Sequence, residues 1–195
     1  MNFQPRSPRL EARVTGVLYL CNMLTGIAAM ILISRRLQSA GDAMNLAASV
    51  LYTVVTLLLW HLFRPVSSWM SAVAAALSLL GCWLPLSRYE AAFPPLHITN
   101  FAFFGLYCLL TGYLIVRSAF MPNFVGVLMA CAGVCWMTTL LPSLTHVLGP
   151  VPMAVGIIGE GTLIVYLIWV GLNERRWQEQ AHGTSRDESA GNVDA

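Results

Sequence analysis

The stretch VPMAVGIIGEGTLIVYLIWVGL, residues 151–172, has the length and apolar character of a membrane-spanning helix. A helix needs about 20 consecutive apolar residues to cross the hydrocarbon core of a bilayer. Glu160 lies close to the middle of this stretch. An acidic residue at such a position costs roughly 2.5–3.5 kcal/mol on insertion scales. We therefore expect hydrogen bonds, protonation or a water-filled cavity to offset that cost.

The composition of the whole chain is that of a membrane protein. Of its 195 residues, 57% are hydrophobic and only 10% are charged, whereas soluble domains carry about 25% charged residues. All basic residues are arginine, and the net charge is only +2, which predicts the lipid bilayer rather than nucleic acid as the partner. The five cysteines lie in apolar runs, so neither a disulfide framework nor a zinc site is expected.

Six apolar runs predict an all-α polytopic membrane bundle of six transmembrane helices. The first run is about 20 residues long and exceeds the roughly 7–15 residues of a cleavable signal core, so we interpret it as a retained span. Residues 1–13 then form an N-terminal segment, and residues 173–195 form a polar tail that we expect to be disordered after its first turn or two. The predicted spans within the domain 14–172 are 14–33, 45–63, 66–84, 96–116, 123–141 and 151–172.

The distribution of arginine predicts the orientation of the bundle. An even number of spans places both termini on one side of the membrane. Three arginines fall on the other side, namely Arg35, Arg36 and Arg88. Positive residues concentrate on the cytoplasmic side, so we expect cytoplasmic termini. The eight arginines on the side of the termini are Arg6, Arg9, Arg13, Arg64, Arg117, Arg175, Arg176 and Arg186.

Glu160 is the acidic residue that this assignment places inside a span, and no Arg or His lies at its depth. One interpretation is functional: a proton or cation site, or a polar contact for a bound headgroup. The other is a hydrogen-bonded acid that fixes the register of the helices. Glycines at 156, 159 and 161 thin the helix around it. Candidate polar partners at similar depth are Asn22, Thr25, Tyr52, Thr56, Tyr107 and Thr111.

No motif of soluble enzymes occurs in the chain. It has no GxSxG, HExxH, Walker or dinucleotide-binding pattern. His61, His97 and His146 lie at the ends of predicted spans, whereas helices that hold a haem need histidines at matched depth. We therefore predict no catalytic residues, no metal site and no cofactor.

The segment FAFFGLYCLLTGYLIVRSAFMPNFVGVLMACAGV, residues 101–134, resembles a bacterial membrane family known as domain-of-unknown-function family 4386. That family has a characteristic FFGL…LLxGYL…RSxFxPR…GVLLxxAG run. Further matches are ARVTGVLYL at 12–20 and the Gly159-Glu160 pair followed by LIWVGL. The chain departs at Asn123, where the family usually has Arg. The matching residues in the segment are Phe103, Phe104, Gly105, Gly112, Tyr113, Leu114, Arg117, Ser118, Pro122, Gly126 and Gly133.

This resemblance implies a multi-pass bundle in a bacterial inner membrane, with Glu160 and Arg117 as family positions, and it supplies no activity. We expect a non-enzymatic accessory or interaction protein whose polar centre at Glu160 holds the bundle together. The first alternative is a small proton-linked transporter or carrier that uses Glu160 as its titrating group. The second is a membrane-embedded enzyme acting on a lipid-like substrate. A homo-oligomer or a membrane-protein partner also fits the Ala- and Gly-rich helix surfaces.

Overall fold

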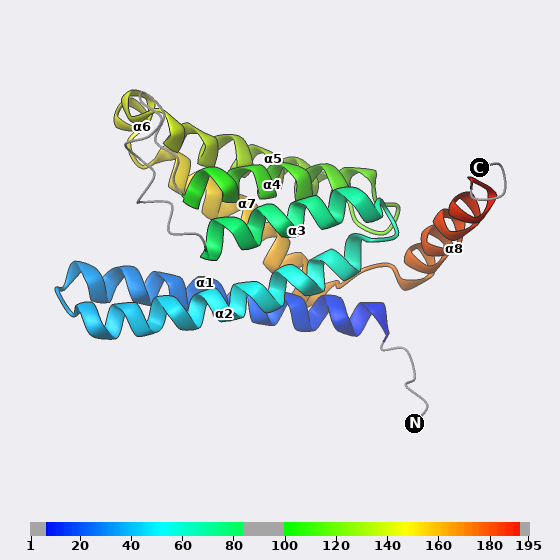
Figure 1. Cartoon of the computed structure of the whole chain (residues 1–195), viewed down its shortest axis with the longest axis horizontal. Coiled ribbons are helices and arrows are strands. Elements are labelled where there is room, and N and C mark those ends of the chain that lie inside the picture. Colours follow the sequence, from blue (N-terminus) through cyan, green and yellow to red (C-terminus); the bar gives the residue numbers. More distant parts are fainter. Residues whose placement is uncertain (1–6, 84–99, 192–195) are drawn as a thin grey trace.

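The structure is a computed structural model that describes residues 7–83 and 100–191, with the backbone alone for 184–191. Every regular element in these ranges is helical, as predicted (Figure 1). A 3₁₀ turn, Thr138–Leu140, follows helix α5. The helices are α1 (Pro8–Ser34), α2 (Gln38–Phe63), α3 (Ser68–Trp83), α4 (Asn100–Arg117), α5 (Asn123–Met137), α6 (Pro142–Leu148), α7 (Val151–Trp169) and α8 (Glu174–Gly191).

Five helical segments among the described residues are long and apolar enough to cross a membrane. They are α1, α2, α4, α7 and the continuous stretch Asn123–Leu140. Helix α3 is apolar but has only 16 residues, which corresponds to about 24 Å against a hydrocarbon core of about 30 Å. By length and composition these segments are candidates for membrane spans, and the six spans with their bounds stay a prediction. The predicted ends at 84 and 96, and the loop carrying Arg88, Glu90 and His97, lie outside the described residues.

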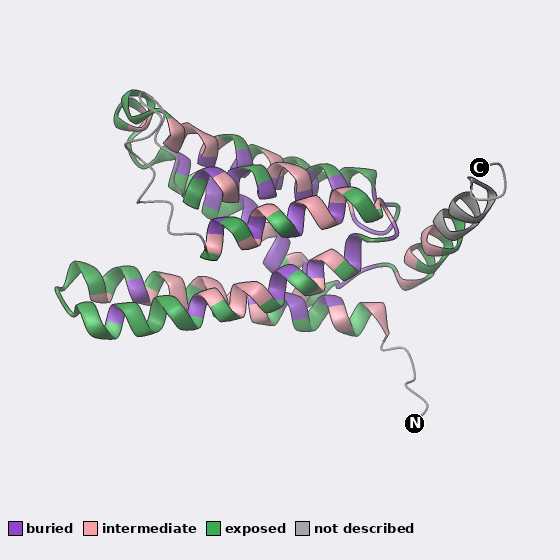
Figure 2. Cartoon of the chain, viewed as in Figure 1, coloured by how far each residue is buried: buried purple, intermediate pink, exposed green. Residues whose placement is uncertain are grey.

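The long helices pack as a closed ring. Each contacts the next in the order α1, α2, α3, α4, α5, α7, and α7 returns to α1. In Figure 1, α1 and α2 form a hairpin beside the group formed by α3, α4, α5 and α7. Buried residues gather where the two groups meet, and the far ends of α1 and α2 are mostly exposed (Figure 2). These ends present apolar side chains such as Leu24, Met30 and Leu46, which suits contact with lipid.

Glycines bring the backbones of α4 and α5 into direct contact. A Cβ atom added to Gly112 would lie 2.6 Å from the carbonyl oxygen of Gly126, and one added to Gly126 would lie 2.6 Å from that of Gly112. Such distances leave no room for any side chain, and small residues are what permit this approach between membrane helices. The small surfaces of α4 and α5 therefore serve packing within one chain.

The first turns of α1 contact the end of α7 at one end of the bundle. Arg13 Nη2 donates to the carbonyl of Trp169 at 3.2 Å, and Arg9 Nε donates to that of Val170 at 3.4 Å. Trp177 Nε1 donates to the carbonyl of Leu62 at 2.9 Å. The starts of α1 and α8 and the ends of α2 and α7 therefore lie together.

Two segments are more helical than the sequence suggested. The expected loop at 142–150 contains the short helix α6. The expected disordered tail forms α8, for which local interactions give a reason. The side chain of Asn173 accepts a hydrogen bond from the backbone N–H of Arg176, and Arg175 pairs with Glu179 one turn later at 2.9 Å. An Asn cap and an i,i+4 ion pair both favour a helix.

Candidate functional site

Glu160 lies buried on α7 and joins three helices through its carboxyl group. Tyr19 Oη on α1 donates to Glu160 Oε2 at 3.2 Å, and Trp136 Nε1 on α5 donates to Glu160 Oε1 at 3.2 Å. Both donors are themselves buried, with 1% and 8% of their surfaces exposed. Each carboxyl oxygen thus has a neutral donor, and these bonds offset part of the cost of placing the acid in an apolar environment.

A glycine on α7 makes room for the indole donor. The ring of Trp136 lies directly over Gly156, where an added Cβ would come within 2.6 Å of its Cε2 atom. Gly156 precedes Glu160 by one helical turn, so the indole N–H is aimed at the carboxyl group. On its other side the indole stacks on Phe101 of α4, with ring centroids 5.0 Å apart. The position of Trp136 is therefore fixed from α4 and α7 together.

Three tyrosines form a cluster beside Glu160. The ring of Tyr52 on α2 contacts those of Tyr19 and Tyr107, with centroids 6.5 Å and 6.0 Å apart, and meets Phe104 edge-on at 5.8 Å. The hydroxyls of Tyr52 and Tyr107 are buried without a hydrogen-bond partner among the described residues. Such hydroxyls call for water or a ligand, because an unpaired buried polar group is costly.

The structure brings only part of the predicted polar set near Glu160. Tyr52 and Tyr107 lie in the tyrosine cluster. Thr56 instead pairs with Ser78 of α3 at 2.7 Å, and Thr25 donates to the carbonyl of Cys21 in its own helix at 2.7 Å. The other two predicted residues, Asn22 and Thr111, line cavities.

The two direct partners of Glu160, Tyr19 and Trp136, were absent from the predicted set. In a span that begins at residue 14, Tyr19 lies in the second turn, near the membrane interface. Helix α1 begins at Pro8, six residues earlier, which moves Tyr19 toward the middle of its helix. Trp136 lies at about the depth of Glu160 in the predicted span 123–141. Tryptophan, however, is most common at the membrane interface, so its residue type does not indicate a partner for Glu160. Extending the first helix to the Pro at its first turn would have identified Tyr19.

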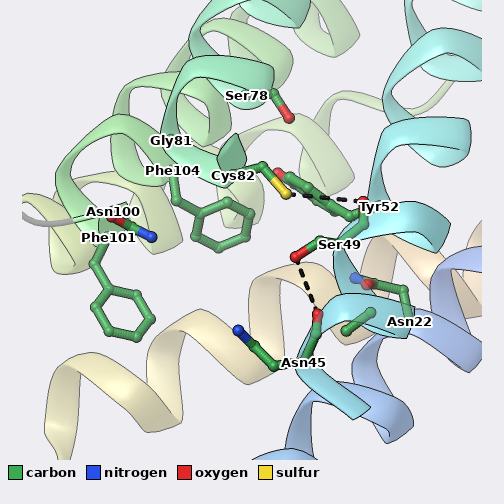
Figure 3. A pocket seen from close by; sticks show the side chains of 11 residues that line it. Asn22, Asn45, Ser49, Tyr52, Ser78, Gly81, Cys82, Asn100, Phe101 and Phe104 are labelled. Carbon is green, nitrogen blue, oxygen red and sulfur yellow. Dashed lines mark hydrogen bonds between the residues drawn. The ribbon is translucent and has the colours of Figure 1, made fainter. Parts of the chain in front are cut away.

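A cavity of about 280 Å³ opens among α1, α2, α3 and α4 (Figure 3). Among the described residues, its lining contains no Asp, Glu, Lys, Arg or His. Phe101 and Phe104 form an aromatic wall, and Tyr52 connects the cavity to Tyr19 and hence to Glu160. The polar lining consists of amides and hydroxyls: Asn22, Asn45, Asn100, Ser49, Ser78 and Tyr52.

A second cavity, of about 10 Å³, lies deeper between α2, α3 and α4. Trp60 and Tyr107 line it, and Trp60 Nε1 and Tyr107 Oη are both buried without a partner among the described residues. A space of about 10–15 Å³ holds one water molecule when polar groups surround it. Thr56, Ser71 and Thr111 add hydroxyls to its lining, so its size and polarity suit one water.

The positions named by the family resemblance have identifiable structural roles. Gly112 and Gly105 pack against the backbone of α5. Gly159 of α7 packs against the carbonyl of Leu128, which also belongs to α5. Arg117 is the last residue of α4, and Pro122 directly precedes α5. Tyr113 is 47% exposed and faces outward. The three glycines shape the α4–α5–α7 packing that holds Trp136 and Glu160 together.

An apolar helical ring, with helices of spanning length and lipid-facing side chains, defines a multi-pass α-helical membrane protein. Residues 95–171 match the model of the family described as "Domain of unknown function (DUF4386)". This match confirms the resemblance to that family and covers α4 to α7, including Glu160 and Trp136. Neither the comparison with curated proteins nor the comparison with solved structures found a match.

Proposed function

We propose that this protein is a non-enzymatic accessory protein of a bacterial inner membrane, in which Glu160 is a structural hydrogen-bond acceptor. The observation that carries this proposal is that both carboxyl oxygens accept bonds from buried neutral donors on two other helices. An acid held in this way fixes the register of α1, α5 and α7. The same helices bury Tyr19 and Leu163 in a continuous core.

We further propose six spans with both termini in the cytoplasm. Helix α4 ends beside the start of α8, because Arg176 Nη1 donates to the carbonyl of Ala119 at 3.3 Å. Helix α2 ends there too, since Trp177 contacts Leu62. The chain between Phe63 and Asn100 therefore has to cross the bundle once, which supports α3 as part of a span despite its length. Arginines at this end support a cytoplasmic location.

Two substitutions of Glu160 test the structural role. Glu160→Gln keeps an acceptor and nearly the same shape, so we expect it to change the free energy of unfolding by less than about 1 kcal/mol. Glu160→Leu leaves the Tyr19 hydroxyl and the Trp136 N–H without an acceptor, and we expect a loss of about 1–3 kcal/mol. The free energy of unfolding of both variants is measured in detergent. Thr162→Val is the control, because the hydroxyl of Thr162 donates to the carbonyl of Ile158 in its own helix and bonds to no other helix in the described part of the chain.

A second experiment distinguishes a structural role of Glu160 from a role in proton transfer. It records infrared difference spectra of the protein in nanodiscs against those of Glu160→Gln. For a structural acceptor, the carboxyl band of Glu160 stays unchanged from about pH 5 to about pH 9. A band that titrates within this range contradicts the structural role. Co-purification in mild detergent tests the accessory role: a monomer without a reproducible partner counts against it.

The second candidate function is a small proton-linked carrier that uses Glu160 as its titrating group. One observation favours it: Tyr52 lines the cavity and packs against Tyr19, whose hydroxyl donates to Glu160. In this case the Glu160 band titrates, and Glu160→Gln abolishes proton-coupled uptake while the fold is kept. If the Glu160 carboxyl band titrates but Glu160→Gln leaves uptake unchanged, the carrier function is contradicted.

A further inference from the structure

We propose that the cavity among α1, α2, α3 and α4 binds an uncharged, hydroxyl-rich group, which is either a free sugar or the sugar headgroup of a lipid. The proposal stands on the cavity itself and is independent of whether Glu160 is structural or titrating. It also adds a ligand class to a protein whose family match assigns none.

The first argument is that the amide side chains lining the cavity have no hydrogen-bond partner among the described residues. Asn22, Asn45 and Asn100 come from three helices and surround the cavity on different sides (Figure 3). Their side chains make no hydrogen bond to any described part of the protein. A side-chain amide offers two donors and an acceptor, so these three groups present an array that matches neighbouring hydroxyls. Asn22 is half-buried, whereas Asn45 and Asn100 are exposed, so the amide of Asn22 is the one for which lacking a partner among the described residues is costly and calls for a ligand or water.

The second argument is the depth of the cavity. Its inner part is formed by Ser78, which is 2% exposed, and by Tyr52, whose buried hydroxyl has no partner among the described residues. Asn45 lies at its exposed rim. The polar lining therefore continues from the surface to the tyrosine cluster, rather than forming a shallow patch. The volume of about 280 Å³ is close to the roughly 300 Å³ at which pockets for small ligands begin.

The third argument is selectivity. A carboxylate or phosphate needs Arg, Lys or backbone N–H donors, and a cation needs carboxylates, yet the described residues that line the cavity include no charged side chain. Phe101 and Phe104 give the cavity flat apolar faces beside the amides. A ring that is apolar on its faces and carries hydroxyls on its edges complements both kinds of surface. These features favour a sugar over an ion or a purely apolar molecule.

Cys82 supplies a reporter for the test, because it is half-buried in the cavity lining and its Sγ donates to the carbonyl of Ser49 at 3.8 Å. In a variant that keeps Cys82 alone, a water-soluble maleimide measures access to the cavity. Nanodiscs expose both faces of the bilayer, so the result does not depend on the proposed orientation. A variant that keeps the fully buried Cys108 alone is the control and should remain unlabelled.

Two probes distinguish the two sources of the sugar. One is glucose added to nanodiscs of phospholipid alone, and the other is a monoglucosyl diacylglycerol placed in the nanodisc. We expect one of them to slow labelling of Cys82 about threefold, which corresponds to two-thirds occupancy. Slowing by glucose alone identifies a free solute, and slowing by the glycolipid alone identifies a headgroup. Gluconate, an anion of similar size, should give no protection.

Two matched variants complete the experiment. Asn22→Leu should abolish the protection, whereas Asn123→Leu should keep it, because Asn123 is exposed at the start of α5 and lies outside the cavity. The proposal is overturned if Cys82 stays unlabelled in the folded protein, since the cavity is then closed to water. It is also overturned if neither probe protects, or if gluconate protects equally.

Discussion

The two sides of this bundle are built on opposite principles. Where α4, α5 and α7 meet, glycines bring backbones into contact and no space remains: an added Cβ on Gly159 would lie 2.6 Å from the carbonyl of Leu128. Where α1 and α2 meet α3 and α4, larger polar side chains enclose a cavity of about 280 Å³. The first side therefore sets the fold, and the second leaves room for a ligand.

Glu160 lies where the two sides meet. Its donor Trp136 belongs to the glycine-packed side, and its donor Tyr19 belongs to the hairpin of α1 and α2. The carboxyl group thus ties the close-packed helices to the more open pair. Substitutions in the close-packed side should therefore unfold the protein, whereas substitutions in the cavity should alter binding with little effect on stability.

The largest effect is expected at the contact between α4 and α5. Gly112→Leu forces a side chain against the carbonyl of Gly126 and the backbone of Ala130. Overpacking of a close contact costs about 1–3 kcal/mol and more where backbone has to move, so we expect most of the protein to be lost from the folded fraction. Fluorescence-detected size exclusion of detergent extracts measures this loss.

The control for this substitution is Gly26→Leu, because no atom of the described residues lies within 4 Å of an added Cβ at Gly26. That variant should fold at least as well as the parent, since glycine is a poor helix former. Equal losses in both variants would mean that the contact of α4 with α5 does not set the fold.

The next effect in size concerns the bond from Trp136 to Glu160. Trp136→Phe removes the indole N–H and leaves Glu160 Oε1 without its donor. We expect the free energy of unfolding to fall by about 1–2 kcal/mol, because the bond is buried and some packing over Gly156 is lost as well. Trp169→Phe is the control, since Trp169 is 73% exposed. Thermal unfolding in detergent compares the two variants. Equal shifts of the unfolding temperature would contradict a stabilising hydrogen bond from Trp136 to Glu160.

Much of the fold could be predicted from the sequence, because membrane helices are encoded in long apolar runs. The helices around Glu160 and the turn at Pro122 follow directly from such runs and from proline. Helix α8 could not be predicted in the same way, since its residues are mostly polar and form no long apolar run. Its start depends on a local cap by Asn173 and on the tertiary contact of Trp177 with Leu62.

The candidate site was predicted at its centre but not in its partners. A lone acid in an apolar run is a strong signal, and Glu160 is where the helices converge. Which side chains face it depends on the order of helices around the ring and on their rotation, and neither follows from hydropathy. Thr25 illustrates the difficulty: it shares a helix with Tyr19, yet its hydroxyl bonds to Cys21 in its own backbone.

A smaller effect is expected at the deeper cavity. Tyr107→Phe removes a buried hydroxyl that has no partner among the described residues. If one water fills the space of about 10 Å³ and bonds to this hydroxyl, the substitution should cost about 1 kcal/mol. Tyr113→Phe, at a position that is 47% exposed, should cost nothing measurable. A gain in stability for Tyr107→Phe would mean that the cavity is dry.

The smallest effect on stability is expected in the ligand cavity itself. Asn45 lies at the exposed rim, and its side chain makes no hydrogen bond to the described part of the protein. Asn45→Leu should therefore change the free energy of unfolding by no more than about 0.5 kcal/mol, as surface substitutions do. The same substitution should weaken protection of Cys82 by the sugar probe. Because the amide contributes to binding but not to folding, a loss of stability comparable to that of Trp136→Phe would show that the open side of the bundle is held by its amides after all.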